Sequence, residues 1–297
     1  AICQMVKKLA QYYHMKRYKN VSKYIITLMC TCCVACTQPK VQNLTILHSN
    51  DTHSQVESLE EGKRDAHCGG YARRMGFITQ QRELDPNILL LDGGDFCQGT
   101  PYFNFYHGRV EVEAMNYMKY DVVTLGNHEF DYGVDTLAAM LKTAKFDIVC
   151  ANYDVTNSPL EDIVKPYTII RRGNLRIGVF GIGVEPTGLI TEKNFHPLQY
   201  LDPVTTAQEI ADMLKNKKKC DIVICISHQG THPGQNGKMS DIELAEATRN
   251  IDIIIGAHSH KIVNNLYIKN QDGDSVLLAQ VGKAGARIGK IELKMTE

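Results

Sequence analysis

The sequence has no net charge and no apolar stretch long enough to cross a membrane, and both absences narrow the function. Its 297 residues carry 33 basic and 33 acidic side chains, a balance that argues against a generally basic nucleic-acid-binding surface. The 43% hydrophobic and 22% charged residues are typical of a globular protein and argue against disorder or a coiled coil. At roughly 150 residues per domain, the length fits two domains or one large α/β domain.

The main part of the chain also lacks paired cysteines. Five of the ten cysteines lie within the first 36 residues. The other five are Cys68, Cys97, Cys150, Cys220 and Cys225, an odd number without a Cys-x-x-Cys pair. We therefore expect neither a disulfide framework nor a thiolate zinc site in this part.

The first 36 residues differ in charge from the rest. Residues 1–35 contain six basic and no acidic side chains, which leaves the remainder with a net charge of −6. An apolar run of 13 residues, Tyr24–Cys36, follows the basic stretch and is shorter than the ~20 residues of a membrane-crossing helix. This order is typical of a secretory signal. The alternative is an N-terminal amphipathic or buried helix.

The end of this run resembles a bacterial lipobox, in which small residues precede a lipidated cysteine. Val34 and Ala35 precede Cys36, although Cys33 stands where leucine is usual. We expect a leader over residues 1–36, with residues 1–14 upstream of a start at Met15. The protein would then be exported, as a periplasmic or membrane-anchored lipoprotein that meets the membrane only through a lipid on Cys36.

From residue 44 onward, short apolar runs alternate with segments that have helical spacing. Runs of this length predict strands that are buried on both faces, and the alternation predicts one α/β domain over residues 41–297. The predicted strands are 44–47, 88–91, 122–125, 148–151, 177–183, 222–227 and 251–255, and the predicted helices are 72–84, 110–118, 136–144, 205–215 and 242–249. Three antiparallel strands, 265–269, 275–281 and 287–294, are predicted at the end.

Five of these predicted strands lead directly into residues that bind metals. In open α/β sheets, binding sites form beyond the carboxyl ends of the strands, so we expect these side chains to converge. Asp51 with His53, and His258 with His260, are spaced so that each pair would point to one side of an extended segment. The full set is Asp51 and His53, Asp92 and Asp95, Asn127 and His128, His228, and His258 and His260.

These motifs resemble those of the calcineurin-like metallophosphoesterases. Gly94–Pro101 and Gly126–Gly133 are similar to the 5′-nucleotidase branch in particular, and the resemblance covers nearly all of residues 44–296. It implies a four-layer αββα sandwich with a single catalytic domain. It also implies two divalent ions, which could be zinc, manganese or iron, and Asp95 would bridge them. One ion would be held by Asp51, His53, Asp95 and His260, and the other by Asp95, Asn127, His228 and His258.

The donor types agree with this implication. Carboxylate, imidazole and amide groups without thiolate suit Zn²⁺, Mn²⁺ or Fe²⁺. Two such ions with Asp51, Asp95 and a bridging hydroxide leave a net charge of +1, which attracts a phosphate. Asp92 is expected to form hydrogen bonds within its loop rather than to bind metal.

The resulting hypothesis is hydrolysis of phosphomonoesters, with 5′-nucleotides first, by the metal-bridging hydroxide. Such an activity belongs to nucleotide catabolism. His128 would stabilise the phosphoryl charge or protonate the leaving oxygen, and Asp131 would orient its ring. Asn127 and His128 would contact the substrate. Arg73 would do so too, although a packing role is about equally expected for it.

Several alternatives stay open at this stage. The same scaffold suits 2′,3′-cyclic-nucleotide or nucleotide-sugar hydrolysis. The secreted relatives carry a C-terminal domain that stacks on the base, so this chain is expected to act alone on small phosphoesters or with a separately encoded substrate domain. A non-catalytic surface-binding lipoprotein is the remaining alternative.

Overall fold

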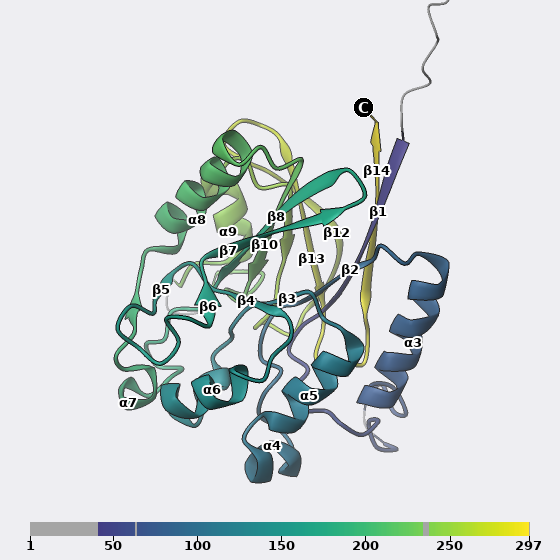
Figure 1. The fold of residues 1–297 in the computed structure, drawn as a ribbon, viewed down its shortest axis with the longest axis vertical. Helices are drawn as coiled ribbons and strands as arrows, with labels where there is room; N and C mark the ends of the chain where they lie inside the picture. The colour runs from purple at the N-terminus through teal and green to yellow at the C-terminus, as the bar shows by residue number, and fades with distance from the viewer. Residues whose placement is uncertain (1–40, 63, 234–237, 297) are drawn as a thin grey trace, which may run out of the picture. The chain divides into compact units, whose positions relative to one another are not determined.

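Two six-stranded β-sheets form the centre of the computed structural model (Figure 1). The structure describes residues 41–62, 64–233 and 238–296, and Gln42–Met295 form a compact unit. The predicted leader over 1–36, with Cys36, lies outside the described residues. Within the described residues, no helix has both the length and the apolar character needed to cross a bilayer.

The first sheet carries the first three predicted strand ends. Strands β1, β2, β3, β4 and β6 run parallel to one another, so their carboxyl ends meet at one edge. Strand β14, which follows the rest of the chain, lies beside β1. In order across the sheet, the strands are β14 (Gly289–Thr296), β1 (Val41–Ser49), β2 (Leu89–Asp92), β3 (Val122–Val123), β4 (Asp147–Val149) and β6 (Val164–Lys165).

The second sheet carries the other two strand ends. Strands β8, β10, β11 and β13 are parallel, and β7 and β12 are antiparallel to their neighbours at the two edges. In order, the strands are β12 (Ile262–Lys269), β13 (Ser275–Val281), β11 (Ile253–Ile255), β10 (Ile222–Ser227), β8 (Leu175–Ile182) and β7 (Tyr167–Arg172). A separate pair joins β5 (Tyr153–Asp154) to β9 (Gln199–Tyr200).

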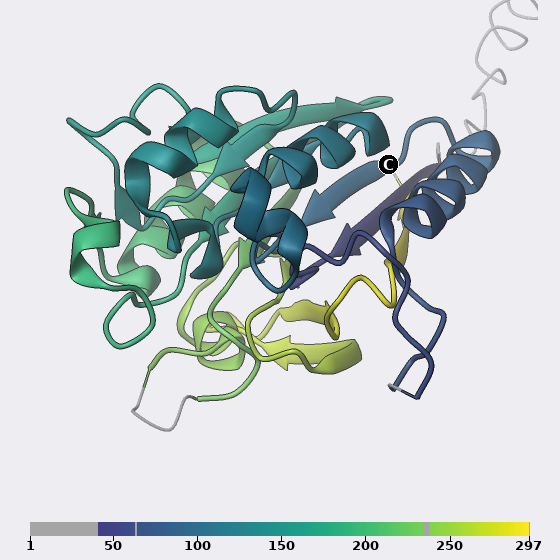
Figure 2. The ribbon, with the colours of Figure 1, turned by 90° about the horizontal axis from the view of Figure 1, so that it is seen from below.

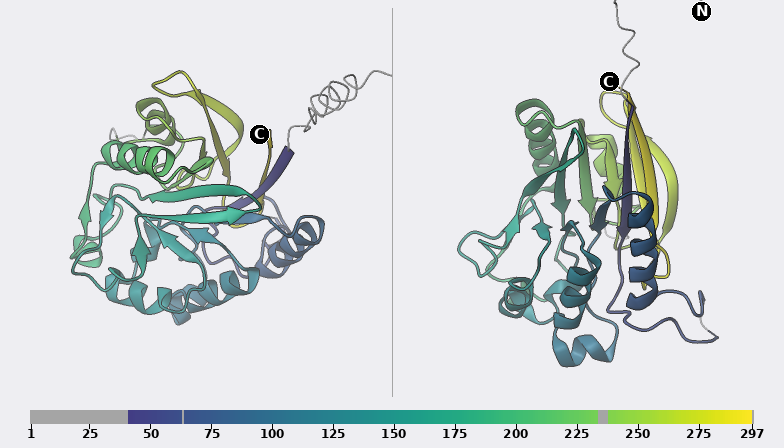
Figure 3. Two further views of the ribbon diagram at one scale, coloured as in Figure 1. Left: turned by 45° about the horizontal axis from the view of Figure 1, so that its top comes forward. Right: turned by 45° about the vertical axis from the view of Figure 1, so that its right-hand side comes forward.

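Helices cover the outer faces of both sheets. Figure 3 shows the strands between helices on the two outer sides. Figure 2 shows the helices beside the first sheet from below. Beside the first sheet lie α3 (Tyr71–Leu84), α4 (Pro101–Tyr106), α5 (Arg109–Met118) and α6 (Gly133–Leu141), with the short η2 (His128–Phe130). Beside the second lie α8 (Pro203–Asp212), the π-helix η3 (Met213–Lys217) and α9 (Asp241–Ala247), and α7 (Glu192–Phe195) precedes β9.

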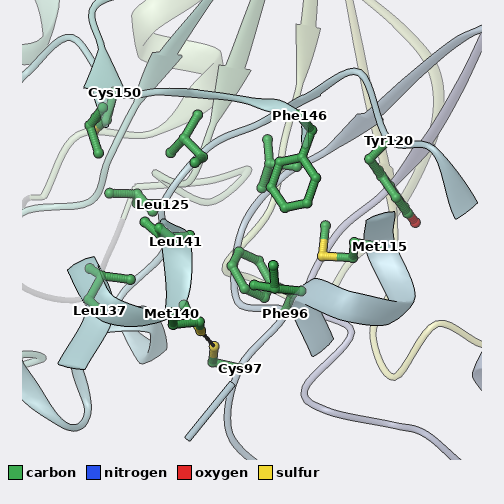
Figure 4. Packing of buried hydrophobic residues seen from close by; sticks show 14 of the residues in the cluster. Phe96, Cys97, Met115, Tyr120, Leu125, Leu137, Met140, Leu141, Phe146 and Cys150 are labelled. Atoms are coloured by element: carbon green, nitrogen blue, oxygen red, sulfur yellow. Dashed lines mark hydrogen bonds between the residues drawn. The ribbon is translucent and has the colours of Figure 1, made fainter. Parts of the chain in front are cut away.

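The central strands are apolar on both faces because each face packs against another layer. In β10, Ile222, Ile224 and Ile226 pack between the two sheets. Val223 and Cys225 point to the other side, toward α8 and α9. A third cluster lies between the first sheet and its helices (Figure 4), where the thiol of Cys97 lies 3.8 Å from the sulfur of Met140. The three clusters confirm the four-layer αββα arrangement.

The structure corrects the prediction at the end of the chain. The expected hairpin between 265–269 and 275–281 is present as β12 and β13. The third predicted strand of that group, residues 287–294, does not pair with them. Its counterpart β14 lies beside β1 in the other sheet. The last strand is therefore the edge strand of the sheet in which the described chain begins.

Candidate metal centre

The loops that follow β1, β2, β3, β10 and β11 bring the predicted ligands together. Three groups have donor atoms that all lie within 4.8 Å of one another. The first and the third are parts of the two ligand sets that the resemblance implies, without Asp95 in the first and without Asn127 in the third, and Asp95 belongs to both the second and the third group. The groups are Asp51, His53 and His260; His53, Asp95 and His128; and Asp95, His228 and His258.

Hydrogen bonds show that His228 fits a cation beside Asp95. The Nδ1 atom of His228 lies 2.7 Å from the carbonyl oxygen of Gly93 and must donate to it, since a carbonyl only accepts. The Nε2 atom lies 3.1 Å from the Asp95 carboxylate oxygen, and although burial opposes it, the charge of Asp95 raises the pKa of His228 to about 10. Two acceptors at this distance repel each other unless a proton or a metal ion lies with them, and His228 is completely buried.

The other candidate donor atoms also lie close together or lack a hydrogen-bond partner. The Nε2 atoms of His53 and His260 lie 2.9 Å apart, and Nε2 of His260 lies 3.4 Å from the Asp51 carboxylate. The side-chain oxygen of Asn127 is buried without a hydrogen-bond partner among the described residues. Carboxylate, imidazole and amide donors in these positions fit divalent cations.

The backbone that places these ligands is not extended. Asp51, His53, Asp95, His258 and His260 all have positive φ, between 45° and 67°, which costs non-glycine residues energy and is common at functional sites. The side chains of each i, i+2 pair therefore converge through tight turns, and the extended segment assumed for them is wrong. Close packing adds a constraint, because a Cβ on Gly126 would lie 2.2 Å from the Asp95 carboxylate.

Glu129 supports this centre, although the sequence analysis assigned it no role. Its carboxylate accepts hydrogen bonds from the backbone N–H groups of Asp95, Cys97 and Gly126, at 2.9, 3.1 and 2.6 Å. Burial, with the nearby charge of Asp95, raises the pKa of Glu129 to about 7. One buried side chain thus ties the loop after β2 to the loop after β3. Its place directly after Asn127 and His128 was the available signal.

Asp92 and Asn50 hold the neighbouring loops. Asp92 accepts from the Ser49 hydroxyl at 2.5 Å and from the Gly94 N–H at 3.0 Å, the loop-bonding role expected for it. The amide of Asn50 donates to the Asp51 carboxylate at 2.6 Å. That carboxylate also accepts from the backbone N–H of His258 at 3.0 Å, so the loops after β1 and β11 are joined through it.

His128 and Asp131 lie at the exposed side of the centre. The Nδ1 atom of His128 is 3.1 Å from the Asp131 carboxylate, and the His128 ring packs edge-on against His53. Burial opposes a charge on the ring, but the hydrogen bond to Asp131 and the charge of Asp95 outweigh it and raise the pKa of His128. The ring can therefore present a positive charge and a proton at its outer nitrogen.

The structure does not bring Arg73 to this centre. Arg73 is an exposed residue of α3 and lines a separate hollow with Cys68, Phe77 and Ile288. The neighbouring Arg74 is buried against the ring of Tyr71. Phosphate contact by Arg73 stays without a geometric basis in the described residues.

Comparisons with known proteins agree with this geometry. A family model described as calcineurin-like phosphoesterase matches residues 44–262. Snake venom 5′-nucleotidase of Naja atra is 36% identical over 226 residues, which cover 73% of this chain and 41% of that protein. Human 5′-nucleotidase is 31% identical and covers 86% of this chain and 47% of its own length.

A solved structure shows the same fold. The 5′-nucleotidase precursor from Thermus thermophilus superimposes with a TM-score of 0.76 at 31% identity, over 86% of this chain and 54% of that one. This chain spans less than half the length of the two curated relatives. The similarity therefore concerns only the part of those proteins that corresponds to the two sheets and their loops.

Proposed function

Because this chain belongs to the calcineurin-like phosphoesterase family, we propose that it hydrolyses phosphomonoesters at the centre formed by the five strand ends. The proposed substrates are 5′-nucleotides, because the relatives from Naja atra, human and Thermus thermophilus are called 5′-nucleotidases. The proposed catalytic domain is residues 41–297.

The observation that carries the proposal is the position of Asp95. Its carboxylate belongs to one donor group with His53 and His128 and to another with His228 and His258, and His53 in turn belongs to a group with Asp51 and His260. A carboxylate shared between two imidazole clusters suits a pair of divalent ions. The unpartnered Asn127 oxygen and the buried Nε2 of His228 beside Asp95 support the same assignment.

We assign the ligands accordingly. Asp51, His53, Asp95 and His260 would hold one ion, and Asp95, Asn127, His228 and His258 the other, with zinc, manganese and iron as candidates. Bound ions of this kind lower the pKa of a water and neutralise phosphoryl oxygens. Burial lowers the pKa of His258 to about 4, which keeps that ring in the neutral form that a ligand requires.

His128 supplies the acid function. Its Nδ1 faces Asp131, so the carboxylate fixes the ring and leaves the outer nitrogen to face substrate. The charged ring would first stabilise the phosphoryl oxygens and then give its proton to the leaving oxygen. His128 also belongs to one donor group with His53 and Asp95, so its role as an acid rather than a ligand has to be tested.

Export completes the proposal. We propose that residues 1–36 are a leader and that Cys36 is lipidated, on the basis of the basic, acid-free flank and the apolar run before it. Mass spectrometry of the protein expressed in a bacterial host tests this. A mature chain that begins at a lipidated Cys36 is the expected result, and a chain that retains residues 15–35 would contradict it.

A panel of phosphoesters tests the activity. Nucleoside 5′-phosphates, 2′,3′-cyclic nucleotides, a nucleotide sugar and an aryl phosphate are incubated with the protein, with and without chelator, and phosphate release is measured after Mn²⁺ or Zn²⁺ is restored. We expect the 5′-phosphates to be cleaved fastest and chelation to abolish cleavage. Failure to cleave any substrate with metal restored would favour a binding protein instead.

A further inference from the structure

A hollow of about 290 Å³ adjoins the Asp51, His53 and His260 group. It lies between the segment that follows the β1 loop and the segment that links β13 to β14. His260 is part of its wall, so the hollow opens beside one set of proposed metal ligands. The lining residues are Leu59, Arg64, Asp65, His260, Ile262, Gly282, Lys283, Ala284 and Arg287.

Backbone hydrogen bonds join the wall of this hollow to the metal centre. The N–H of Ala284 donates to the carbonyl of Asp51 at 2.8 Å. The side chain of Asn50 donates to the carbonyl of Gly282 at 2.7 Å, and the N–H of Gly282 donates to the carbonyl of Lys261 at 2.8 Å. A group bound in the hollow would therefore lie against the same backbone that positions Asp51 and His260.

The opposite wall is fixed by an ion pair. The guanidinium of Arg287 donates two hydrogen bonds to the Asp65 carboxylate, at 2.9 and 2.5 Å. The segment that carries Asp65 is closed at its base by hydrogen bonds of Leu59 with Cys68 and with His67, both 2.8 Å. The Asp65 pair therefore joins this segment to Arg287, and the Leu59 bonds hold the two ends of the segment together.

The lining has an excess of positive charge. Three cations, Arg64, Lys283 and Arg287, face one carboxylate, Asp65. Asp65 pairs with Arg287 and also interacts with the charge of Arg64, while within the described residues neither Arg64 nor Lys283 lies within ion-pair distance of a carboxylate. The sequence beyond residue 35 is acidic overall, so a lining with three cations and one carboxylate is a local exception. Leu59 and Ile262 add an apolar surface between them.

We propose that this hollow is a subsite for a second anionic group of the substrate. A phosphoester whose leaving group carries a further phosphate or carboxylate would place that group between Arg64 and Lys283, with an apolar part against Leu59 and Ile262. The inference rests on the proposed function, because it takes the reacting phosphate to lie at the metal centre. It makes the hollow a determinant of specificity.

Matched substrates test the subsite. Adenosine 5′-phosphate and adenosine 3′,5′-bisphosphate differ only in the second phosphate, and kcat/KM is measured for both. The variants are Arg64→Met with Lys283→Met, and Lys290→Met as control, since Lys290 lies on β14 and pairs with Glu292. We expect the wild type to favour the bisphosphate. In the double variant, the ratio of kcat/KM for the bisphosphate to that for the monophosphate should fall roughly tenfold, because charge-assisted phosphate contacts are lost. The control keeps the preference.

A binding measurement separates this inference from the activity. Non-hydrolysable phosphonate counterparts of both nucleotides are titrated by calorimetry into the metal-loaded protein and the same variants. If no substrate is turned over, the proposed function fails, while weaker binding of only the doubly anionic ligand by the double variant still supports the subsite. Equal effects of the double variant on both ligands, or no effect on either, would overturn it.

Discussion

At the residue scale, some side chains lie beside the proposed metal ligands, and others bind the backbone of the loops that carry those ligands. His128, the proposed acid, lies at the exposed side of the centre with Asp131 behind it. His128→Ala is expected to lower kcat by about 10²–10⁴-fold and to leave the bound metal unchanged, as measured by metal analysis. His232→Ala, an exposed histidine, is the control. Loss of metal from the His128 variant would identify it as a ligand.

Glu129 acts through the backbone of two loops. A glutamine at this position keeps the size but places an amide N–H against one of three backbone N–H donors. Glu129→Gln is expected to weaken metal binding by about 10–100-fold, as for other groups that orient ligands. Titration of the metal-free protein with Mn²⁺ measures this, with the exposed Glu113→Gln as control. Unchanged affinity would show that the loops hold without it.

His48 lies in β1, away from the donor groups, and gives the folded state a pH dependence. It is 1% exposed, its Nδ1 has no partner among the described residues, and burial lowers its pKa from 6.5 to about 4. As the pH falls below 6.5, the unfolded chain takes up a proton that the folded chain does not, so stability falls until about pH 4.

The expected loss from this one group is up to about 3 kcal/mol in the free energy of unfolding. Urea unfolding at pH 7 and pH 4.5 measures it, and His48→Leu should remove that part of the pH dependence. If the wild type and the variant lose the same stability over this interval, His48 is not the cause.

At the scale of the elements, the two sheets come into close contact where β8 passes β4. A Cβ on Gly181 would lie 2.0 Å from the carbonyl oxygen of Val149 and 2.4 Å from the Thr124 hydroxyl. Gly181→Ala is therefore expected to destabilise the fold by about 1–3 kcal/mol or more, measured by urea unfolding. Gly76→Ala in α3 is the matched control, since nothing lies within 4 Å of its Cβ position. It should stabilise by about 0.5–1 kcal/mol. Equal effects would contradict the close approach.

The sequence predicted the central strands better than the edges, for a physical reason. Strands such as β10 are covered on both faces, and so they read as continuous apolar runs. The edge strand β7 is half-buried and ends in Arg171 and Arg172, so no such run marks it. The pairing of β14 with β1 joins opposite ends of the described chain, and a contact at that separation leaves no local pattern.

The centre was predicted as a set of residues but not as a geometry. The strand ends indicated which side chains converge, because parallel strands end at one edge. The positive φ values of Asp51, His53 and three other donors follow from packing between loops, which spacing cannot reveal. The same holds for Glu129, whose three partners come from two separate loops.

For the whole molecule, the four layers explain how a chain that is acidic beyond residue 35 could bind the proposed anionic substrate. The buried strands fix the positions of five loops, and those loops bring the donor atoms of histidines and aspartates within 4.8 Å of one another in each group. Two divalent ions would reverse the local charge there, so no broad basic surface is needed.

The number of metal ions bound per chain tests this account most directly. Metal-free protein is dialysed against Mn²⁺, and the ratio of metal to protein is measured for the wild type and for Asp95→Asn. The expected result is two ions per chain in the wild type and fewer in the variant, because Asp95 is grouped with His53 on one side and with His228 and His258 on the other and is the proposed ligand of both ions. A wild-type ratio near zero, or equal ratios in both proteins, would contradict the shared two-ion centre.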